Sequence, residues 1–209
     1  KIKFLKTHHA NCSVKDYKLF DDINTLGAIH IVRDPRNVLT SIKNHFALED
    51  FIEAKKFILS EKKWIGMITS KNKTIEYNDD NKIPTLISSW RINYLSWKNQ
   101  TKNYLLIKYE DLLKNTNYEV LKIYNYLKKF YNLNLSTEEL GQIVKLSSFK
   151  NLQRKENEDG FEEGMQYKDK KVPFFRHGAW NDWKKELDKK IVNDLEKEFS
   201  KEMKELGYL

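Results

Sequence analysis

The chain has 209 residues, a typical length for a single globular domain, and 40% of them are hydrophobic. With only 7 glycines and 3 prolines, collagen-like and low-complexity chains are excluded. The net charge of +8 favours an anionic partner such as a nucleotide, a nucleic acid or an acidic membrane surface, but lysines exposed on helix faces explain it equally well.

A single cysteine, Cys12, excludes an intramolecular disulfide framework and a cysteine-rich zinc site. It suits a reducing compartment, so a cytoplasmic protein is expected. No run approaches the roughly 20 apolar residues of a membrane-spanning helix, and we find no signal peptide. The chain begins at Lys1 rather than at a methionine, which leaves a preceding targeting segment open.

Short apolar runs predict strands at residues 2–5, 27–32 and 104–107. The second run leads directly into Arg33 and Pro35, and proline is favoured at the first position of a helix. That helix has an apolar stripe suited to packing against a sheet, formed by Val38, Leu39, Ile42 and Phe46. Further helices are predicted over residues 50–59, 85–100, 118–131, from 136 onward and over 188–206, and loops over 70–82 and 157–171.

Strands that alternate with helices predict an α/β fold with a short parallel sheet flanked by helices. In such folds, ligands bind beyond the carboxyl ends of the strands. Polar clusters follow all three predicted strands, at residues 6–8, 33–41 and 108–111. We therefore expect the functional site at this edge of the sheet.

Arg33 lies between a predicted buried strand and the start of a helix, and Ser41 follows two helical turns later. A guanidinium, a hydroxyl and the free N–H groups of a helix N-terminus together favour a doubly charged anion such as a phosphate. Taken alone, a solvated loop arginine and an ordinary helical serine explain the same residues.

Lys6 and His8 alternate to the same side of an extended segment. A lysine there can neutralise charge on a transferred group, and an imidazole can accept a proton from a hydroxyl. A histidine after a strand is also common as a structural residue, and His9 beside it leaves the choice of histidine open.

Arg176 and Gly178 lie in a second basic segment, where an arginine precedes a glycine whose backbone can approach a phosphate closely. Trp180 and Trp183, which follow, are interpreted as packing residues. The sequence has no Walker loop, no HExxH and no metal-ligand cluster. Phosphate chemistry would therefore depend on positive side chains and backbone amides.

Five segments occur together in an order that resembles the cytosolic-type sulfotransferases, which use 3′-phosphoadenosine 5′-phosphosulfate (PAPS). They are FLKTH (4–8), IVRDPRNVLTS (31–41), LLIKYEDLLKN (105–115), SSFKNL (147–152) and FFRHGAWNDW (174–183). The resemblance implies a P-loop NTPase-like three-layer sandwich in a single domain, residues 1–209. It also implies that the family's first strand and phosphosulfate loop lie upstream of this chain.

The resemblance further implies a role for each matching residue. His8 would be the general base, and Lys6 would stabilise the transferring sulfuryl group. Tyr109, Ser147 and Phe149 would border the adenine. The 3′-phosphate would be held by Arg33, Ser41, Arg176, His177 and Gly178. The reaction implied is direct in-line transfer from PAPS to the hydroxyl of an alcohol, phenol or sugar, without a metal, releasing 3′-phosphoadenosine 5′-phosphate (PAP).

Two residues depart from the family pattern: His177 stands where the family has lysine, and Asn181 where it has glycine. Alternatives are a basic nucleic-acid-binding module, a related nucleotide kinase, which would need Mg²⁺ and acidic ligands, and a non-catalytic PAP binder. We expect no nucleic-acid partner and no membrane span. The acceptor and the oligomeric state are not specified by the sequence, and residues 61–82 and 157–171 are candidate walls of the acceptor site.

Overall fold

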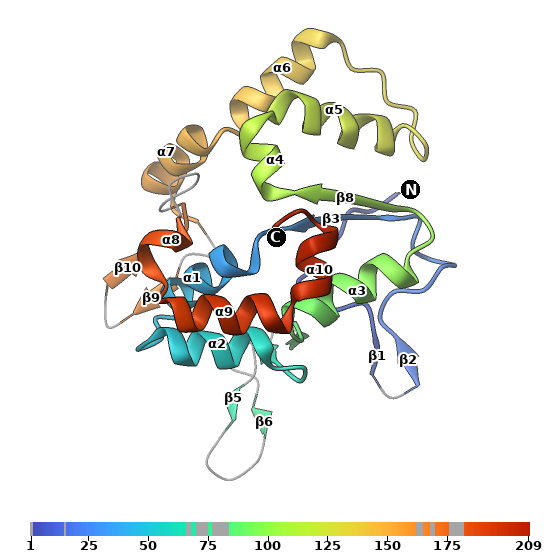
Figure 1. Cartoon of the computed structure of the whole chain (residues 1–209). Helices are drawn as coiled ribbons and strands as arrows, with labels where there is room; N and C mark the ends of the chain where they lie inside the picture. Colours follow the sequence, from blue (N-terminus) through green and yellow to red (C-terminus); the bar gives the residue numbers. More distant parts are fainter. Residues whose placement is uncertain are drawn as a thin grey trace.

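The computed structural model describes residues 2–14, 16–65, 68–69, 75–76, 84–161, 165–167, 170–175 and 182–209. At its centre lies a parallel pair of strands, β3 (Ala28–Val32) and β8 (Tyr104–Lys108), shown in Figure 1. Ala28 pairs with Tyr104 and Val32 with Lys108, so the two strands end side by side. Among the described residues β3 pairs only with β8, which leaves its other edge open.

One face of this sheet is covered by the largest group of helices. α1 (Pro35–His45) begins directly after β3, with Pro35 in its first turn and the Asp34 carboxylate accepting from the Arg36 amide. The other members are α2 (Phe51–Leu59), α3 (Trp90–Gln100), α9 (Lys189–Glu198) and α10 (Ser200–Glu205). Their shared core comprises Leu39, Ala54, Ile58, Ile191, Leu195, Phe199 and Met203.

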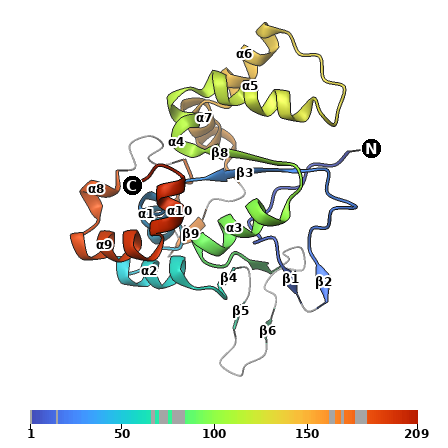
Figure 2. The same ribbon diagram turned by 45° about the vertical axis from the view of Figure 1, so that its right-hand side comes forward.

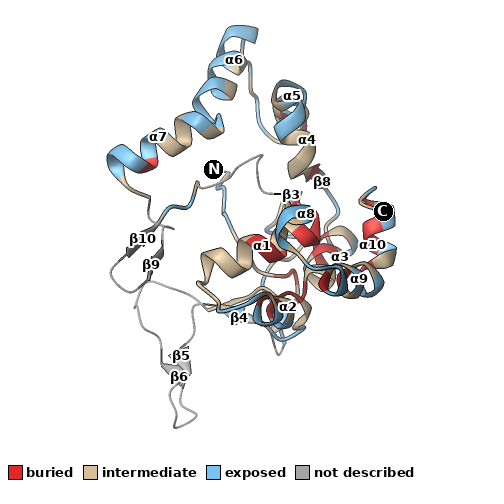
Figure 3. Cartoon of the chain, turned by 60° about the vertical axis from the view of Figure 1, so that its left-hand side comes forward, coloured by how far each residue is buried: buried red, intermediate tan, exposed pale blue. Residues whose placement is uncertain are grey.

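The opposite face of the sheet carries a second group of helices. They are α4 (Tyr109–Lys114), α5 (Thr116–Leu127), α6 (Thr137–Leu146) and α7 (Phe149–Asp159). Figures 1 and 2 show α5 above the sheet and α3 below it, which gives the three layers of an α/β fold. Figure 3 shows that the buried residues concentrate in the lower group and that α6 and α7 are largely exposed.

The remaining described elements are short and lie around this core. The antiparallel pairs are β1 (Ser13–Val14) with β2 (Tyr17–Lys18), β4 (Trp64–Ile65) with β7 (Thr85–Leu86), β5 (Ile68–Thr69) with β6 (Ile75–Glu76), and β9 (Met165–Tyr167) with β10 (Lys170–Val172). A single-turn helix, α8 (Trp183–Glu186), precedes α9. Within the described ranges, none of the helices has the length and apolar character that a membrane crossing requires.

The predicted α/β class, the two central strands and the helix after Pro35 are confirmed. The predicted capping box is also present: Ser136 accepts from the Glu139 amide, and the Glu139 carboxylate accepts from the Ser136 amide. The strand predicted over residues 2–5 is wrong, since residues 2–10 adopt no strand. A strand needs a hydrogen-bonded neighbour, and a cavity lies between this segment and β3 instead.

Other boundaries also differ from the prediction, and three of the differences have a clear structural reason. The helix expected over residues 85–100 begins only at Trp90, because the Ser89 hydroxyl caps it there and Thr85–Leu86 pairs with β4. The expected loop over 157–171 contains the end of α7 and the β9–β10 pair. The last predicted helix is two helices that meet at the buried Phe199, and this bend keeps Met203 in the core.

Candidate active site

The turn between β3 and α1 presents Arg33 at the carboxyl end of the sheet. Arg33 Nη1 donates to Ser41 Oγ over 3.4 Å, and the guanidinium carbon lies 4.5 Å from the centroid of the Tyr109 ring. Tyr109 comes from the first position of α4, directly after β8. The fold therefore brings together three of the predicted site residues, which come from two segments far apart in the sequence.

The peptide group that follows Arg33 is fixed at both of its polar ends. Trp90 Nε1 donates to the Arg33 carbonyl oxygen over 3.1 Å, and the Asp34 amide donates to Glu110 Oε1 over 3.1 Å. The Asp34 carboxylate also accepts from the buried Arg36 guanidinium, with a closest distance of 2.6 Å. The backbone that carries Arg33 is therefore held by side chains from α3, α4 and α1.

The guanidinium of Arg33 is partly withdrawn from water. Burial lowers its pKa, and the neighbouring Tyr109, Glu110 and Asp34 oppose this change. Arginine nevertheless stays protonated in proteins. Its Nε is buried and has no hydrogen-bond partner among the described residues. A buried donor without an acceptor is costly, so the arrangement favours an anion that would accept from it.

A cavity of about 1170 Å³ opens beside this turn, and its lining includes Lys6, His8 and Arg33. Its walls come mainly from residues 2–9, from β3 and from aromatic side chains of α3 and α5. The lysine and histidine that were predicted to take part in group transfer therefore share a cavity with the arginine that was predicted to bind phosphate.

The structure distinguishes the two adjacent histidines. His9 Nδ1 accepts from the Leu86 amide over 3.1 Å, so its Nε2 is the nitrogen that donates to the Pro84 carbonyl, also over 3.1 Å. Both ring nitrogens of His9 are therefore engaged with backbone. His8 is exposed toward the cavity, and its carbonyl oxygen accepts from Asn93 Nδ2 over 3.2 Å. The two adjacent histidines therefore have different surroundings: the His9 ring is bonded to the backbone of residues 84–86, whereas His8 is exposed and lines the cavity.

Ser147 and Phe149 belong to a second cluster. Ser147 is exposed at the end of α6, where its hydroxyl donates to the Ile143 carbonyl over 2.8 Å. Phe149 begins α7, and its ring centroid lies 6.2 Å from that of Phe175. The described contacts of these two residues thus lie within this second cluster rather than at Arg33. The predicted Arg176, His177 and Gly178, and the departure at Asn181, lie outside the described residues.

Comparison with known proteins decides the family. The family model of the sulfotransferase domain matches residues 3–207. The chain belongs to the sulfotransferase family. Human Sulfotransferase 2A1 is 29% identical over 180 residues, which align 85% of this chain with 56% of that protein. The Macaca fascicularis protein of the same name is 27% identical over the same shares. The chain therefore spans little more than half the length of these curated relatives.

Solved structures show the same fold. The crystal structure of mouse sulfotransferase SULT7A1 complexed with PAP superposes with a TM-score of 0.57 at 19% identity, covering 84% of this chain and 57% of that one. Retinol dehydratase in complex with androsterone and inactive cofactor PAP gives a TM-score of 0.54 at 18% identity, covering 84% and 47%. The α/β arrangement of this sulfotransferase chain is therefore that of these two solved proteins.

Several residues that support the site were missed by sequence reasoning. Glu156 is 3% exposed, and its two carboxylate oxygens accept from the amides of Phe174 at 2.6 Å and Phe175 at 2.8 Å. The segment that leads into the predicted phosphate-binding residues is therefore attached to α7. The available signal was helical spacing, because Glu156 falls seven residues after Phe149 and four after Leu152, on one face of the helix.

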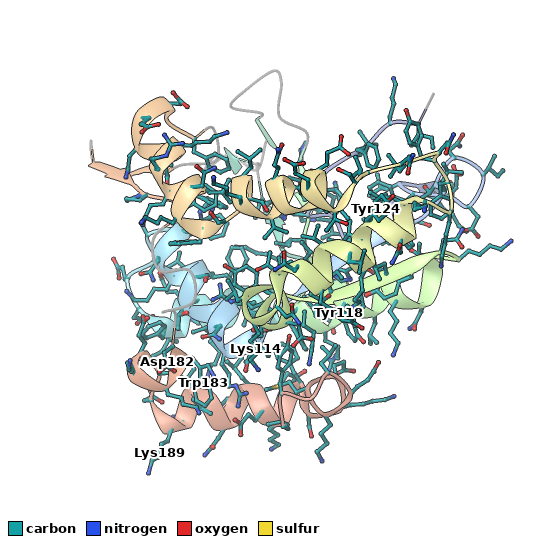
Figure 4. The ribbon with its side chains drawn as sticks, turned by 90° about the horizontal axis from the view of Figure 1, so that it is seen from above. Lys114, Tyr118, Tyr124, Asp182, Trp183 and Lys189 are labelled. Atoms are coloured by element: carbon teal, nitrogen blue, oxygen red, sulfur yellow. The ribbon has the colours of Figure 1, made fainter. Side chains whose placement is uncertain are left out.

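Arg36 was also missed, although it lies inside the segment that resembles the family. Its guanidinium bonds to Asp34, pairs with Glu196 over 2.5 Å and lies 4.2 Å from the Trp183 ring. Trp183, labelled in Figure 4, donates its backbone N–H to Asn37 Oδ1 over 3.1 Å, which attaches α8 to α1. Trp183 is thus a packing residue, as predicted.

The described residues fit a phosphorylated nucleotide at the turn after β3. The partnerless Nε of Arg33 supplies a donor, the Ser41 hydroxyl lies beside it, and the Tyr109 ring forms one wall. In the part of the chain that the structure describes, no three His, Cys, Asp or Glu side chains are grouped as a metal ion would need.

Proposed function

We propose that this chain forms part of an enzyme that transfers a sulfuryl group from PAPS to a hydroxyl of a small molecule. The observation that carries the proposal is the half-buried guanidinium of Arg33, which has an unsatisfied Nε beside Ser41 and Tyr109 and shares a cavity with Lys6 and His8. Because the chain aligns with only 56% of its curated relatives, the rest of the enzyme would supply further residues of the site.

The nucleotide end of PAPS would bind at the turn after β3. Arg33 and Ser41 would donate to the 3′-phosphate, together with Arg176, His177 and the Gly178 backbone. Tyr109, Ser147 and Phe149 would border the adenine. Two solved structures of the same fold, a mouse sulfotransferase and retinol dehydratase, contain PAP, which supports this choice of nucleotide. Preorganised cations and N–H donors suit phosphate because they need little rearrangement when it binds.

Lys6 and His8 would carry out the transfer. PAPS supplies the sulfuryl group, and PAP is the product that leaves. The His8 imidazole accepts the proton that the acceptor hydroxyl releases as its oxygen bonds to sulfur and the bond from sulfur to the phosphate oxygen breaks. Lys6 stabilises the negative charge that is redistributed during this step. His9 does not compete for the proton because both of its nitrogens are already bonded.

The acceptor would be a small alcohol or phenol in the cytoplasm. Aromatic residues from α3 and α5 line the same cavity as His8, which favours an apolar molecule over a sugar. Retinol dehydratase, which has this fold, is complexed with androsterone, a hydroxyl compound of this kind.

A nucleic-acid-binding module receives little support. Such a module presents exposed aromatic side chains among basic ones. Here Tyr94, Trp97 and Tyr126 are at most 8% exposed and pack in the interior, whereas the exposed Tyr118 and Tyr131 lie in or just after a single helix, α5. The net charge therefore remains compatible with a nucleotide ligand alone.

Calorimetric titration with PAP tests the proposal. We expect the natural full-length protein to bind PAP and Arg33→Ala to bind at least tenfold more weakly. Arg91→Ala is the matched control, since Arg91 pairs with Glu198 on α9 and lies apart from the cavity lining. Wild-type protein that neither binds PAP nor forms it from PAPS and a phenol would overturn the proposal. Binding without transfer to any alcohol or phenol would instead indicate a non-catalytic nucleotide binder.

A further inference from the structure

The carboxyl-terminal residues of the chain fold back onto the turn that carries Arg33. Gly207 has φ of +72°, a conformation that glycine adopts without strain, and it ends α10. The Gly207 amide donates to the Lys204 carbonyl over 3.1 Å and the Tyr208 amide to the Met203 carbonyl over 2.8 Å, which form a Schellman motif. This reversal directs Tyr208 toward the ends of β3 and β8.

Tyr208 forms hydrogen bonds through both its side chain and its backbone. Its hydroxyl donates to Glu110 Oε2 over 2.9 Å, and its carbonyl oxygen accepts from Arg36 Nη2 over 2.8 Å. Burial raises the pKa of the Tyr208 hydroxyl, and the Glu110 charge raises it further, so the hydroxyl keeps the proton that it donates. Tyr208 therefore donates to Glu110 and accepts from Arg36, and both of these residues also bond to Asp34.

Glu110 transmits this contact to Arg33. Its second oxygen, Oε1, accepts from the Asp34 amide. This amide N–H and the Arg33 carbonyl oxygen belong to the same peptide group. Glu110 also follows Tyr109, the residue whose ring lies against the guanidinium. Each oxygen of Glu110 is thus occupied by a donor other than Arg33.

From this network we infer that Tyr208 is a positioning residue for the nucleotide site, acting through Glu110 on Arg33. The inference depends on the proposed function. Without the Tyr208 hydroxyl, one oxygen of Glu110 loses its donor, and the carboxylate can turn toward Arg33 and compete with the 3′-phosphate. Tyr208 follows the last residue that the family model matches, so the inference rests on this chain's own contacts.

The test compares Tyr208→Phe with Tyr94→Phe. The Tyr94 hydroxyl donates to the Glu205 carboxylate over 2.9 Å, just as the Tyr208 hydroxyl donates to Glu110 over 2.9 Å. The Tyr94–Glu205 pair does not bond to the turn that carries Arg33. We expect Tyr208→Phe to weaken PAP binding about fivefold to tenfold in calorimetry and Tyr94→Phe to leave it unchanged. Equal affinities for PAP in all three proteins would overturn the inference.

A double-mutant cycle shows whether the effect passes through Arg33. In protein that already carries Arg33→Lys, we expect Tyr208→Phe to change the PAP affinity less than twofold, because the group that it positions is gone. An undiminished effect in that background would mean that Tyr208 acts on overall stability, and the inference would fail. Wild-type protein that does not bind PAP at all would instead contradict the proposed function itself, which separates the two failures.

Discussion

Arg33 and Tyr109 are neighbours because Val32 and Lys108, the residues before them, pair at the ends of two parallel strands. The register of β3 against β8 therefore sets the distance of 4.5 Å between the guanidinium carbon and the ring centroid. A ring face against a cation attracts it without competing for its N–H donors. One of those donors, Nη1, is directed toward Ser41 Oγ.

Replacing Tyr109 tests this contact. We expect Tyr109→Leu to weaken PAP binding about tenfold, because a partly buried cation–π contact contributes roughly 1–2 kcal/mol. Tyr109→Phe keeps a ring and should bind within about twofold of wild type. Tyr118→Leu is a matched control, since its ring also lies near a cation, Lys122, but at the exposed surface. An effect of Tyr118→Leu on PAP binding equal to that of Tyr109→Leu would contradict the expectation.

The two adjacent histidines should fail in different ways when replaced by glutamine. We expect His8→Gln to reduce the rate of sulfuryl transfer about 100-fold to 10,000-fold, the usual contribution of a general base, with little change in stability. His9→Gln should instead lower the free energy of unfolding by about 1–3 kcal/mol, because two bonds to the backbone of residues 84–86 are disturbed. Urea unfolding and initial rates with PAPS and a phenol measure the two effects, and a rate unaffected by His8→Gln would remove His8 as the base.

Because His30 has a lowered pKa, we expect the free energy of unfolding to fall in mild acid. Burial lowers its pKa to about 4, below the usual value of 6.5, and its Nδ1 lies 2.9 Å from the Tyr104 hydroxyl. The unfolded chain therefore takes up a proton at a higher pH than the folded chain. Neutral His30 contributes up to about 3 kcal/mol to the free energy of unfolding. This contribution is fully present above about pH 6.5 and is lost as the pH falls toward 4.

Urea unfolding between pH 4 and pH 7 measures the contribution of His30. In His30→Gln, which cannot take up this proton, the decline over that range should be smaller by most of the 3 kcal/mol. Identical pH dependence in wild type and His30→Gln would show that His30 does not titrate differently in the folded and unfolded chains.

The Glu156 carboxylate should fix the backbone of residues 174–175, whose amides donate to it. We expect Glu156→Ala to leave the Phe174 and Phe175 amides without an acceptor and to lower the free energy of unfolding by about 2–3 kcal/mol. Hydrogen exchange at those two amides should become much faster. Glu158→Ala removes an exposed carboxylate that pairs with Arg154 and should leave both properties nearly unchanged. Unchanged exchange in Glu156→Ala would contradict this role.

Sequence patterns predicted those helices and strands that are determined by residues close together in the chain. The β-branched run before Arg33, the proline after it and the capping box at Ser136 each determine structure within a few residues. The grouping of Arg33 with Tyr109 also followed, since polar residues after parallel strands meet at one edge. What could not be predicted depends on residues far apart in sequence: Glu110 meets Asp34 and Tyr208 only after the sheet and α10 have formed.

The predicted strand over residues 2–5 failed for a related reason. Its apolar residues suit a strand, but β structure exists only between partners, and the neighbouring position at β3 is empty among the described residues. The start of α3 failed because the Ser89 hydroxyl, rather than the apolar spacing, determines where the helix begins.

The open edge of β3 bears on how the isolated chain behaves at high concentration. Ile29 and Ile31 are 36% and 53% exposed beside backbone groups that no described strand satisfies, and Phe4 and Leu5 are more than 70% exposed nearby. Such edges pair readily with other chains. Light scattering of the 209-residue chain should therefore increase with concentration, and an Ile31→Lys variant should stay dispersed. Affinities measured on this chain are best obtained in dilute solution.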